Sequence, residues 1–487
     1  MPRIRPIPST LLATLTAAAA LLPLLGRKPL TDWDEAIYAE VSREMLGHSW
    51  LIPHWNAALW LEKPPLMLWI TAVFFHLFGV TEFWARAASA LSGVAMVGVL
   101  HWWLARRRDT LAAWLSTLVL LGTFGFLHAC HTGEMDAMLS LGCVIALIGL
   151  AQVEAENDSG WLLFWTGFAV AAMTKGAASV TLPITAAILT AVERRRLRGA
   201  FFVGLAICLA IALPWHLAMF HLFGRDFVRE YLGLHVLTRA TRQIEGHNTA
   251  WWFYFKVLLV AAPPFVLLYP AAVARALRRD SRLRAFAVFA LVVLGFFSVV
   301  QTRLPQYIVP MYPALAVVTA AWLRDRVRRL LAGPRRVLWT RLAAVAVISA
   351  VCVWMTTPAR KSLHSANLAG VPASDSKDST ALLRDRLQTQ PIGGPLLVWH
   401  AGRVMSMPTI VFYARRPVVQ VQLVALASEP QRDRYTFDPQ PAAEVITAEP
   451  RLILLDRALV AQIPGGFRYT AIEAQGGMEL GTIARVR

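Results

Sequence analysis

The chain alternates long apolar runs with short arginine clusters, and this alternation constrains its fold more than any other feature. Hydrophobic residues make up 56% of the 487 positions and charged residues only 16%, whereas soluble domains carry about 25% charged residues. Runs of about 20 apolar residues cross a bilayer as helices, and arginine favours the cytoplasmic side. The pattern therefore predicts a polytopic α-helical membrane protein. The clusters between the runs are Arg106–Arg108, Arg194–Arg198, Arg275–Arg284 and Arg324–Arg336.

The formal charge of +18 belongs to these loops, so it does not indicate a nucleic-acid partner. The four cysteines lie in or beside apolar runs and show neither metal-ligand spacing nor a disulfide framework. We predict that they are small buried hydrophobic residues. They are Cys130, Cys143, Cys208 and Cys352.

Placing Arg3 and Arg5 on the inside gives a topology in which every large arginine cluster faces the cytoplasm. The first apolar run resembles a signal peptide, but we expect it to stay uncleaved as the first span. The run Leu66–Val80 has 15 residues, short of the ~20 that cross a bilayer, and is predicted to be interfacial or re-entrant. The eleven predicted spans cover about residues 8–26, 83–104, 111–129, 135–151, 161–174, 177–192, 200–219, 251–273, 285–300, 306–323 and 337–355.

The composition changes after the last predicted span, so two domains are expected. Residues 1–355 would form the transmembrane domain, and residues 356–487 a small α/β domain on the outer face. The second part mixes polar turns with the strand-like runs PLLVWH, RPVVQVQLV and RLILLD and with the helical stretch STALLRDRLQ. This mixture is typical of a soluble α/β domain.

Ionisable residues gather on the predicted outer side of the membrane. Charged groups near membrane depth are costly and mark substrate or ion sites by default. Their convergence on one face therefore predicts a functional site there. The residues are Asp34, Glu35, Tyr38, Glu62, Lys63, Asp136, Lys175, His235, Arg239, Arg303 and Tyr307.

These residues also have purely structural interpretations. Asp34 and Glu35 stand in the first turn of a short helix, where acidic side chains cap the helix and complement its dipole. Lys175 could extend its ammonium group to the membrane interface. Glu62 and Lys63 could form a local ion pair ahead of a Pro-Pro turn.

Cations, a tyrosine and carboxylates at a lipid interface suit the transfer of a sugar from a lipid phosphate. Lysine and arginine neutralise a phosphate, and a carboxylate deprotonates a nucleophile or orients sugar hydroxyls. Nucleotide sugars are absent outside the membrane, so the donor must arrive already activated, as a polyprenyl-phosphate sugar does. No cofactor is required. A divalent metal near Asp34 and Asp136 is compatible with the residues, although no ligand spacing demands one.

Several segments resemble one known family. DEAIYAEVSREML, WLIPHWNAALWLEKPPL, MTKG and SVVQTRLPQYIVPMYP are similar to segments of the bacterial aminoarabinose transferases of lipid A. More widely, they resemble protein mannosyltransferase-like glycosyltransferases. The similarity runs in order through nearly all of residues 30–320, and a weaker one covers VWHAGRVMSMPTIVFYARRPV. The resemblance implies a GT-C fold with about 11 transmembrane helices, juxtamembrane periplasmic helices and a small C-terminal periplasmic α/β domain.

The resemblance also implies roles for individual residues. Asp34 would be the catalytic carboxylate of the first periplasmic loop, with Glu35 beside it. Lys63 would bind the lipid phosphate, and Arg239 would assist from a later loop. Glu62 would belong to the donor site, Asp136 to a second acidic motif and Tyr307 to the carrier headgroup. We assign Tyr38, Trp60, Lys175, His235 and Arg303 to the same substrate-binding set.

The chain departs from the family pattern at a few positions. Ile37 stands where the family has the arginine of DEARYAE, and Trp60 stands where it has the tyrosine of YFEKPP. The later Lys-Leu-Pro is Arg-Leu-Pro, beginning at Arg303. Without a cation at position 37, neutralisation of the carrier phosphate falls to the remaining lysines and arginines. The identity of the sugar and of the acceptor stays open.

The sequence thus predicts a glycosyltransferase of the bacterial inner membrane with its site facing the periplasm. It would transfer one sugar, with inversion, from undecaprenyl phosphate to a periplasmic acceptor such as lipid A, lipopolysaccharide or another envelope glycan. Its partners would be the lipid donor, the acceptor and membrane lipids. One alternative is an oligosaccharyltransferase or protein O-glycosyltransferase. Another is a flippase or transporter of lipid-linked sugars, although no internal repeat is evident.

Overall fold

The computed structural model describes residues 6–194, 196–238, 241, 250, 252–332, 382–399, 408–424 and 439–486. The chain divides into two compact units. Unit 1 comprises Met1–Leu25, Leu61–Phe74 and Arg86–Ala369, and unit 2 comprises Gly26–Trp60, Phe75–Ala85 and Gly370–Arg487. The division therefore differs from a single boundary after residue 355, because two short outer segments pack with the C-terminal part of the chain.

Unit 1 is a bundle of apolar helices. Where lipid offers no hydrogen-bonding partner, an apolar run satisfies its backbone groups by forming a helix, and aromatic side chains such as Phe286 and Phe289 fill the core. The helices are α1 (Pro6–Leu21), α4 (Glu82–Arg106), α5 (Thr110–Leu121), α6 (Phe124–His131), α7 (Asp136–Val153), α8 (Gly160–Lys175), α9 (Thr181–Val192), α10 (Gly199–Phe227), α12 (Phe253–Ala261), α13 (Tyr269–Arg279), α14 (Ser281–Val299) and α15 (Met311–Ala332). Helix α3 (Leu66–Phe78) begins in unit 1 and ends in unit 2, and α4 begins in unit 2, which includes residues 82–85.

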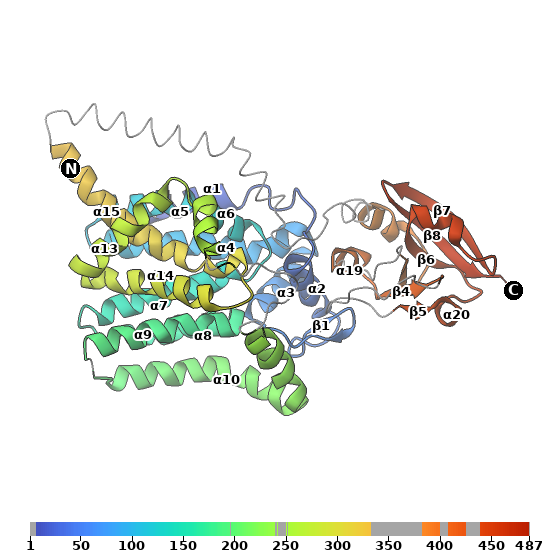
Figure 1. Cartoon of the computed structure of the whole chain (residues 1–487), viewed down its shortest axis with the longest axis horizontal. Helices are drawn as coiled ribbons and strands as arrows, with labels where there is room; N and C mark the ends of the chain where they lie inside the picture. The colour runs from blue at the N-terminus through green and yellow to red at the C-terminus, as the bar shows by residue number, and fades with distance from the viewer. Residues whose placement is uncertain are drawn as a thin grey trace. The chain divides into compact units, whose positions relative to one another are not determined.

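Helices α7 and α8 pack side by side, and α10 lies against α8 (Figure 1). Glycines allow the close approach of α7 and α8. A Cβ atom at Gly142 would lie 2.8 Å from the backbone nitrogen of Ala171 on α8, and Gly149 faces Gly160 in the same way. Small residues at such contacts are the usual means by which membrane helices approach one another.

Ion pairs fix the direction of these helices. Arg284, at the start of α14, contacts Glu193 just after α9 at 2.6 Å and Glu154 just after α7 at 4.0 Å. The C-terminal ends of α7 and α9 are therefore together, and α8 runs the opposite way between them. The reversal comes at Gly176, whose φ of +40° is a backbone conformation that glycine adopts readily. Residues 160–192 thus contain two helices that run in opposite directions. By length and composition they count together as one candidate span, so the two separate spans stay a prediction.

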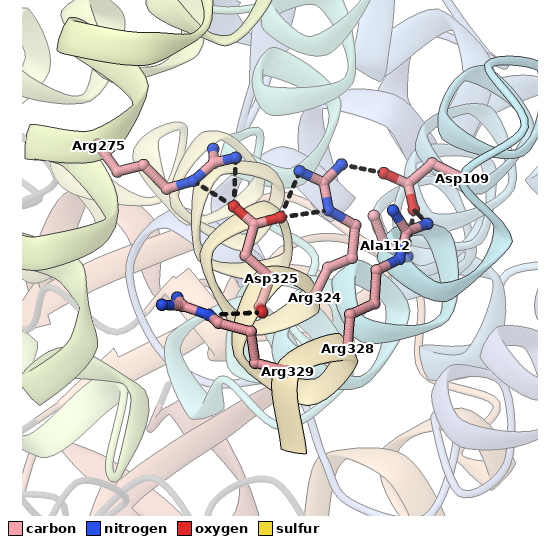
Figure 2. Close-up of polar contacts among 7 residues, drawn as sticks. All are labelled: Asp109, Ala112, Arg275, Arg324, Asp325, Arg328 and Arg329. Atoms are coloured by element: carbon pink, nitrogen blue, oxygen red, sulfur yellow. Dashed lines mark hydrogen bonds and ion pairs between the residues drawn. The ribbon is translucent and has the colours of Figure 1, made fainter. Parts of the chain in front are cut away.

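The other loops predicted to be cytoplasmic also meet at one end of the bundle, here called the arginine-rich end (Figure 2). Asp325 near the end of α15 accepts hydrogen bonds from Arg275 of α13 at 2.8 Å and from Arg324 at 2.8 Å. Arg324 also pairs with Asp109, which precedes α5 and accepts a hydrogen bond from the backbone N–H of Ala112. These contacts bring together three loops that the topology placed on the inside.

Two predicted spans are broken rather than continuous. Helices α5 and α6 meet at an angle of 67°, and α12 meets the helical segment from Phe265 to Arg279 at 118°. Among the described residues, five helices are long and apolar enough to cross a membrane, or seven if each bent pair is one span. Helix α3 has 13 residues, about 20 Å, in keeping with the expectation that its run is too short to cross. Residues 337–355 lie outside the described residues, so the total of eleven stays a prediction.

Unit 2 contains a six-stranded sheet with the strand order β5-β4-β3-β6-β8-β7. Strands β3, β4, β5 and β6 are parallel neighbours, while β8 runs antiparallel to β6 and β7. The three strand-like runs of the sequence form β3, β4 and β6, which confirms the predicted α/β character. The strands are β3 (Leu396–Trp399), β4 (Val418–Gln422), β5 (Gln440–Pro441), β6 (Arg451–Asp456), β7 (Phe467–Gln475) and β8 (Met478–Arg485).

The segment Gly26–Trp60 also belongs to unit 2. It contains helix α2 (Asp34–Glu44) and a short antiparallel pair, β1 (His54–Trp55) with β2 (Ala58–Leu59). Helix α2 packs against α19 (Pro408–Ala414) of the C-terminal segment. Every side chain of α19 is buried, as is expected of a short helix held between neighbouring elements. A further short helix, α20 (Ala442–Val445), follows β5.

Candidate functional site

Asp136 and Lys175 form a buried ion pair at the end of unit 1 opposite the arginine-rich end. Asp136 is the first residue of α7 and Lys175 the last of α8, so the antiparallel packing of these helices brings the two side chains together. The Lys175 ammonium group donates to both carboxylate oxygens at 2.7 Å. The exposed fractions are 1% for the Asp136 side chain and 10% for Lys175. An ion pair so shielded from water is strong but costly to form.

Tyr307 joins this pair through its ring. The Lys175 nitrogen lies 5.7 Å from the centre of the Tyr307 ring, within the range of a cation–π contact. Tyr307 belongs to the 3₁₀ segment η4 (Pro305–Ile308), and its ring also lies 5.1 Å from that of Phe297 on α14. Asp136, Lys175 and Tyr307 are hereafter called the membrane-unit cluster.

Three further predicted residues lie in unit 1. Arg303 is buried, precedes η4 and donates from its guanidinium group to the carbonyl oxygen of Ser298 at 2.6 Å. Glu62 is buried and Lys63 half-buried in the segment that leads into α3. The same unit thus holds the cluster, one further carboxylate and two further cations.

In unit 2, Asp34 is the half-buried first residue of α2. The helix begins after Trp33, which has a φ of 70° and a ψ of −132°. Glu35 does not point away from its own segment: its carboxylate accepts hydrogen bonds from the backbone N–H of Thr31 at 2.7 Å and from the Thr31 hydroxyl at 2.9 Å. This contact gives Glu35 a local structural role, whereas Asp34 stands at the positive end of the helix dipole.

Tyr38 and Trp60 lie together one turn further on. Their rings meet edge to face with centroids 6.1 Å apart, a favoured aromatic geometry. Ile37 is 1% exposed, so the position where the family has an arginine is here part of an apolar core. Val41 and Met45, which follow Ile37 at helical spacing, are buried as well.

The sequence analysis did not identify two further buried carboxylates on α2, those of Glu40 and Glu44. Glu40 is buried and accepts two hydrogen bonds from the Arg43 guanidinium at 2.7 and 2.6 Å. Burial raises the pKa of Glu40 to about 7, although Arg43 opposes this shift. Glu44 is also buried and accepts from the backbone N–H of Ala57. The spacing of three residues between Glu40 and Arg43 was the available signal, since side chains so spaced lie on one helix face.

The structure says less about Arg239 and His235. Arg239 lies outside the described residues, and His235 is known only by its position in the π-helical segment η2 (Val228–Thr238). Among the described residues, no group of three or more His, Cys, Asp or Glu side chains is arranged to hold a metal ion. The described contacts thus gather the candidates into two groups, the membrane-unit cluster in unit 1 and the residues around α2 in unit 2.

Comparison with known proteins shows which sequences are similar. A family model described as dolichyl-phosphate-mannose-protein mannosyltransferase matches residues 62–217. The undecaprenyl phosphate-α-4-amino-4-deoxy-L-arabinose arabinosyl transferase of Pectobacterium carotovorum is 33% identical over 346 residues, which are 66% of this chain and 61% of that protein. The protein of the same name from Serratia proteamaculans is 30% identical and is covered over 60% of its length. The matched segment thus spans about three fifths of these relatives.

Solved structures share the fold. ArnT from Cupriavidus metallidurans bound to undecaprenyl phosphate superposes with a TM-score of 0.74 at 21% identity, covering 97% of both chains. The Archaeoglobus fulgidus oligosaccharyltransferase superposes with a TM-score of 0.55 at 14% identity, covering 98% of this chain and 73% of that one. The chain therefore has a GT-C fold, and the predicted fold class is confirmed.

Proposed function

We propose, from the premise that this multi-pass membrane protein is an ArnT-like member of the GT-C fold class, that it is a glycosyltransferase. Its donor is a sugar carried on undecaprenyl phosphate, and its acceptor is a glycan or lipid on the periplasmic side of the inner membrane. The observation that carries the proposal is the buried Asp136–Lys175 pair beside Tyr307, at the end of the bundle away from the cytoplasmic arginines. A cation held at that depth suits a lipid-borne phosphate.

The reaction is a single displacement at the anomeric carbon of the donor sugar. An acceptor oxygen forms the new bond to that carbon, the bond from the carbon to the phosphate oxygen breaks, and undecaprenyl phosphate leaves with the electron pair. Attack from the face opposite the leaving group inverts the configuration. Asp34 takes the proton of an acceptor hydroxyl, or orients the acceptor where no proton is lost.

The cations act on the leaving group. Lys63, Arg239 and Arg303 neutralise the phosphate as charge develops on its oxygen. Lys175 contributes its charge through the membrane-unit cluster, while Asp136 holds it in place and balances its charge between turnovers. We assign Tyr38 and Trp60 to the binding of the sugar; their side chains are 3% and 2% exposed, and their rings pack edge to face.

We also propose that the transfer requires no divalent metal. Both oxygens of Asp136 accept from Lys175, so this carboxylate already has a cationic partner, and the ammonium group supplies the positive charge that a metal would bring. The expected result is full activity after treatment with EDTA. Loss of transfer that is restored by added magnesium or zinc would contradict this part of the proposal.

The identity of the transferred sugar is a separate question. The names of the relatives give 4-amino-4-deoxy-L-arabinose as the sugar on their donor, and that donor is the first probe to use. Position 37 is a buried isoleucine here, so a neutral residue replaces the cation of the family pattern. We therefore propose that the chain accepts an undecaprenyl-phosphate sugar and that its preference among such sugars differs from that of the relatives.

Purified protein in proteoliposomes tests the reaction. The probes are undecaprenyl phosphate carrying 4-amino-4-deoxy-L-arabinose or a neutral hexose, with lipid A as acceptor, and mass spectrometry measures released undecaprenyl phosphate and modified lipid A. Asp34→Asn should lower kcat by about 100-fold or more, while Asp325→Asn at the arginine-rich end serves as the matched control. Full activity of Asp34→Asn would exclude Asp34 as the reacting carboxylate. Turnover of diphosphate-linked oligosaccharides alone would favour the oligosaccharyltransferase alternative.

A further inference from the structure

The residue before Asp34 has a strained backbone. Trp33 has a φ of 70° and a ψ of −132°, a conformation that residues with a Cβ atom rarely adopt. Such a conformation persists only when the surrounding structure holds it, and strain of this kind clusters at functional sites. The carbonyl oxygen of Trp33 nevertheless accepts the hydrogen bond from Ile37 N–H at 2.9 Å that starts the helix. The direction in which α2 leaves this turn therefore depends on what holds the turn.

Two hydrogen-bonded contacts from α19 hold it. The Asp32 carboxylate accepts from the backbone N–H of Thr409 at 3.1 Å and from its hydroxyl at 2.5 Å. The hydroxyl of Tyr413, one turn along α19, accepts from the backbone N–H of Leu30 at 2.9 Å and donates to Glu82 at 3.1 Å. Both contacts fall within the four residues that precede Asp34, and both come from a helix almost 380 residues later in the chain.

A third contact holds the other end of the outer segment. The Asn56 side-chain amide donates to the carbonyl oxygen of Val418 at 3.0 Å, and the Val418 N–H donates to the amide oxygen at 2.9 Å. Val418 is the first residue of β4, which follows α19 directly. The segment that carries Asp34 is thus fastened on both sides of α2 to one stretch of the C-terminal part.

We propose that Asp32, Thr409 and Tyr413 are positioning residues that set the placement of Asp34. The C-terminal segment then has a part in the reaction, because its helix α19 fixes the turn that precedes the reacting carboxylate of Asp34. This inference rests on the proposed function, in which Asp34 meets the acceptor. An error of about 1 Å in the position of such a group is enough to slow a reaction about 100-fold.

A purely structural role for the same contacts makes a different prediction. If they only stabilise unit 2, their loss lowers thermal stability and leaves the kcat of the folded protein unchanged. If they position Asp34, their loss lowers kcat at a temperature where the protein is folded, while the KM for the donor stays nearly constant. A conservative variant that keeps the hydrogen bond should then recover kcat.

Kinetics of matched variants in proteoliposomes distinguish the two roles. Thr409→Val removes the hydroxyl donor and keeps the shape of the side chain, whereas Thr409→Ser keeps the donor. Tyr469→Phe is the control: it removes a hydrogen bond of 2.8 Å to Glu479 in the same unit, on the edge strand β7. We expect Thr409→Val to lower kcat about tenfold or more with KM changed less than about twofold, and Thr409→Ser and Tyr469→Phe to retain kcat.

Hydrogen exchange gives a readout apart from activity. The first amides of α2 should exchange faster in Thr409→Val than in wild type, and at the wild-type rate in Tyr469→Phe. Unchanged kcat and unchanged exchange in Thr409→Val would overturn the inference. If instead Asp34→Asn is as active as wild type, the proposed function itself fails, and the exchange result still reports whether α19 holds the turn.

Discussion

The two ends of the helix bundle both contain ion pairs between carboxylates and cations, but they differ in depth. At the arginine-rich end, Asp325 and Arg324 have side chains that are 31% and 18% exposed, and each has several partners (Figure 2). At the opposite end, Asp136 is 1% exposed, and both of its carboxylate oxygens accept from Lys175. Water screens the charges of the first group, whereas the second pair is almost fully shielded from water.

This difference in exposure suggests different roles for the ion pairs at the two ends of the bundle. Ion pairs open to solvent each contribute up to about 1 kcal/mol, and their arginines are already required on that side by the orientation of the helices. A buried pair is rarely better for stability than apolar residues of similar size, so its presence needs another reason. We infer that the arginine-rich end fixes the orientation of the bundle and that the buried pair serves the reaction.

Breaking the buried pair should have the largest effect. Lys175→Met leaves the Asp136 carboxylate buried without its cation, which costs about 3–5 kcal/mol of unfolding free energy, and we expect kcat to fall at least about 100-fold. The double variant Asp136→Asn with Lys175→Met removes both charges. It should regain most of the thermal stability in detergent and still transfer no sugar at an appreciable rate. Recovery of kcat in the double variant would show that the pair is structural.

The contact between Glu40 and Arg43 on α2 predicts a pH dependence of stability. The pKa of Glu40 is raised from 4.5 to about 7, because burial outweighs the effect of Arg43. Between these pH values the folded protein binds more protons than the unfolded one, so the unfolding free energy falls as pH rises from about 4.5 to about 7. The fall is on the order of 3 kcal/mol. Thermal unfolding at several pH values should show this slope in wild type and a smaller slope in Glu40→Gln.

If Glu40→Gln keeps the full slope, another group is responsible for it. Glu44 lies one turn from Glu40 and is also buried, so Glu44→Gln is the matched variant. A slope that disappears only in Glu44→Gln would move the titration to that carboxylate. Loss of the slope in Glu40→Gln alone would show that a buried pair on α2 changes its protonation within the physiological range.

The sequence predicted the side on which each group lies better than it predicted their contacts. Apolar length and arginine position are properties of the local sequence, and they placed Asp136 and Lys175 on one side and the arginine clusters on the other. The pairing of Asp136 with Lys175 requires the antiparallel packing of α7 and α8, which glycines at matching positions along the two helices allow. The periodicity of apolar residues in the sequence does not predict which positions of two helices face one another.

The role of Asp32 shows the same limit. Asp32 stands two residues before α2, and nothing in the local sequence indicates its distant partner. In the structure it accepts from Thr409, and the backbone turn at Trp33 stands between it and the helix. A contact between residues so distant in the chain depends on the tertiary fold of unit 2. The same kind of distant contact groups residues 26–60 with the C-terminal part in unit 2, and the domain boundary after residue 355 stays a prediction.

The smallest effect is expected at the arginine-rich end. Asp325→Asn removes the charge that Arg275 and Arg324 share but keeps an oxygen acceptor, so the unfolding free energy should fall by about 1 kcal/mol or less. Because the network is partly open to solvent, raising the salt concentration to about 1 M should shrink the difference from wild type. The kcat for sugar transfer should stay within about twofold of wild type, since the proposed function gives Asp325 no part in the reaction. A large loss of kcat at unchanged stability would mean that the two ends of the bundle are coupled. The arginine-rich end would then contribute to the reaction as well as to the orientation of the helices.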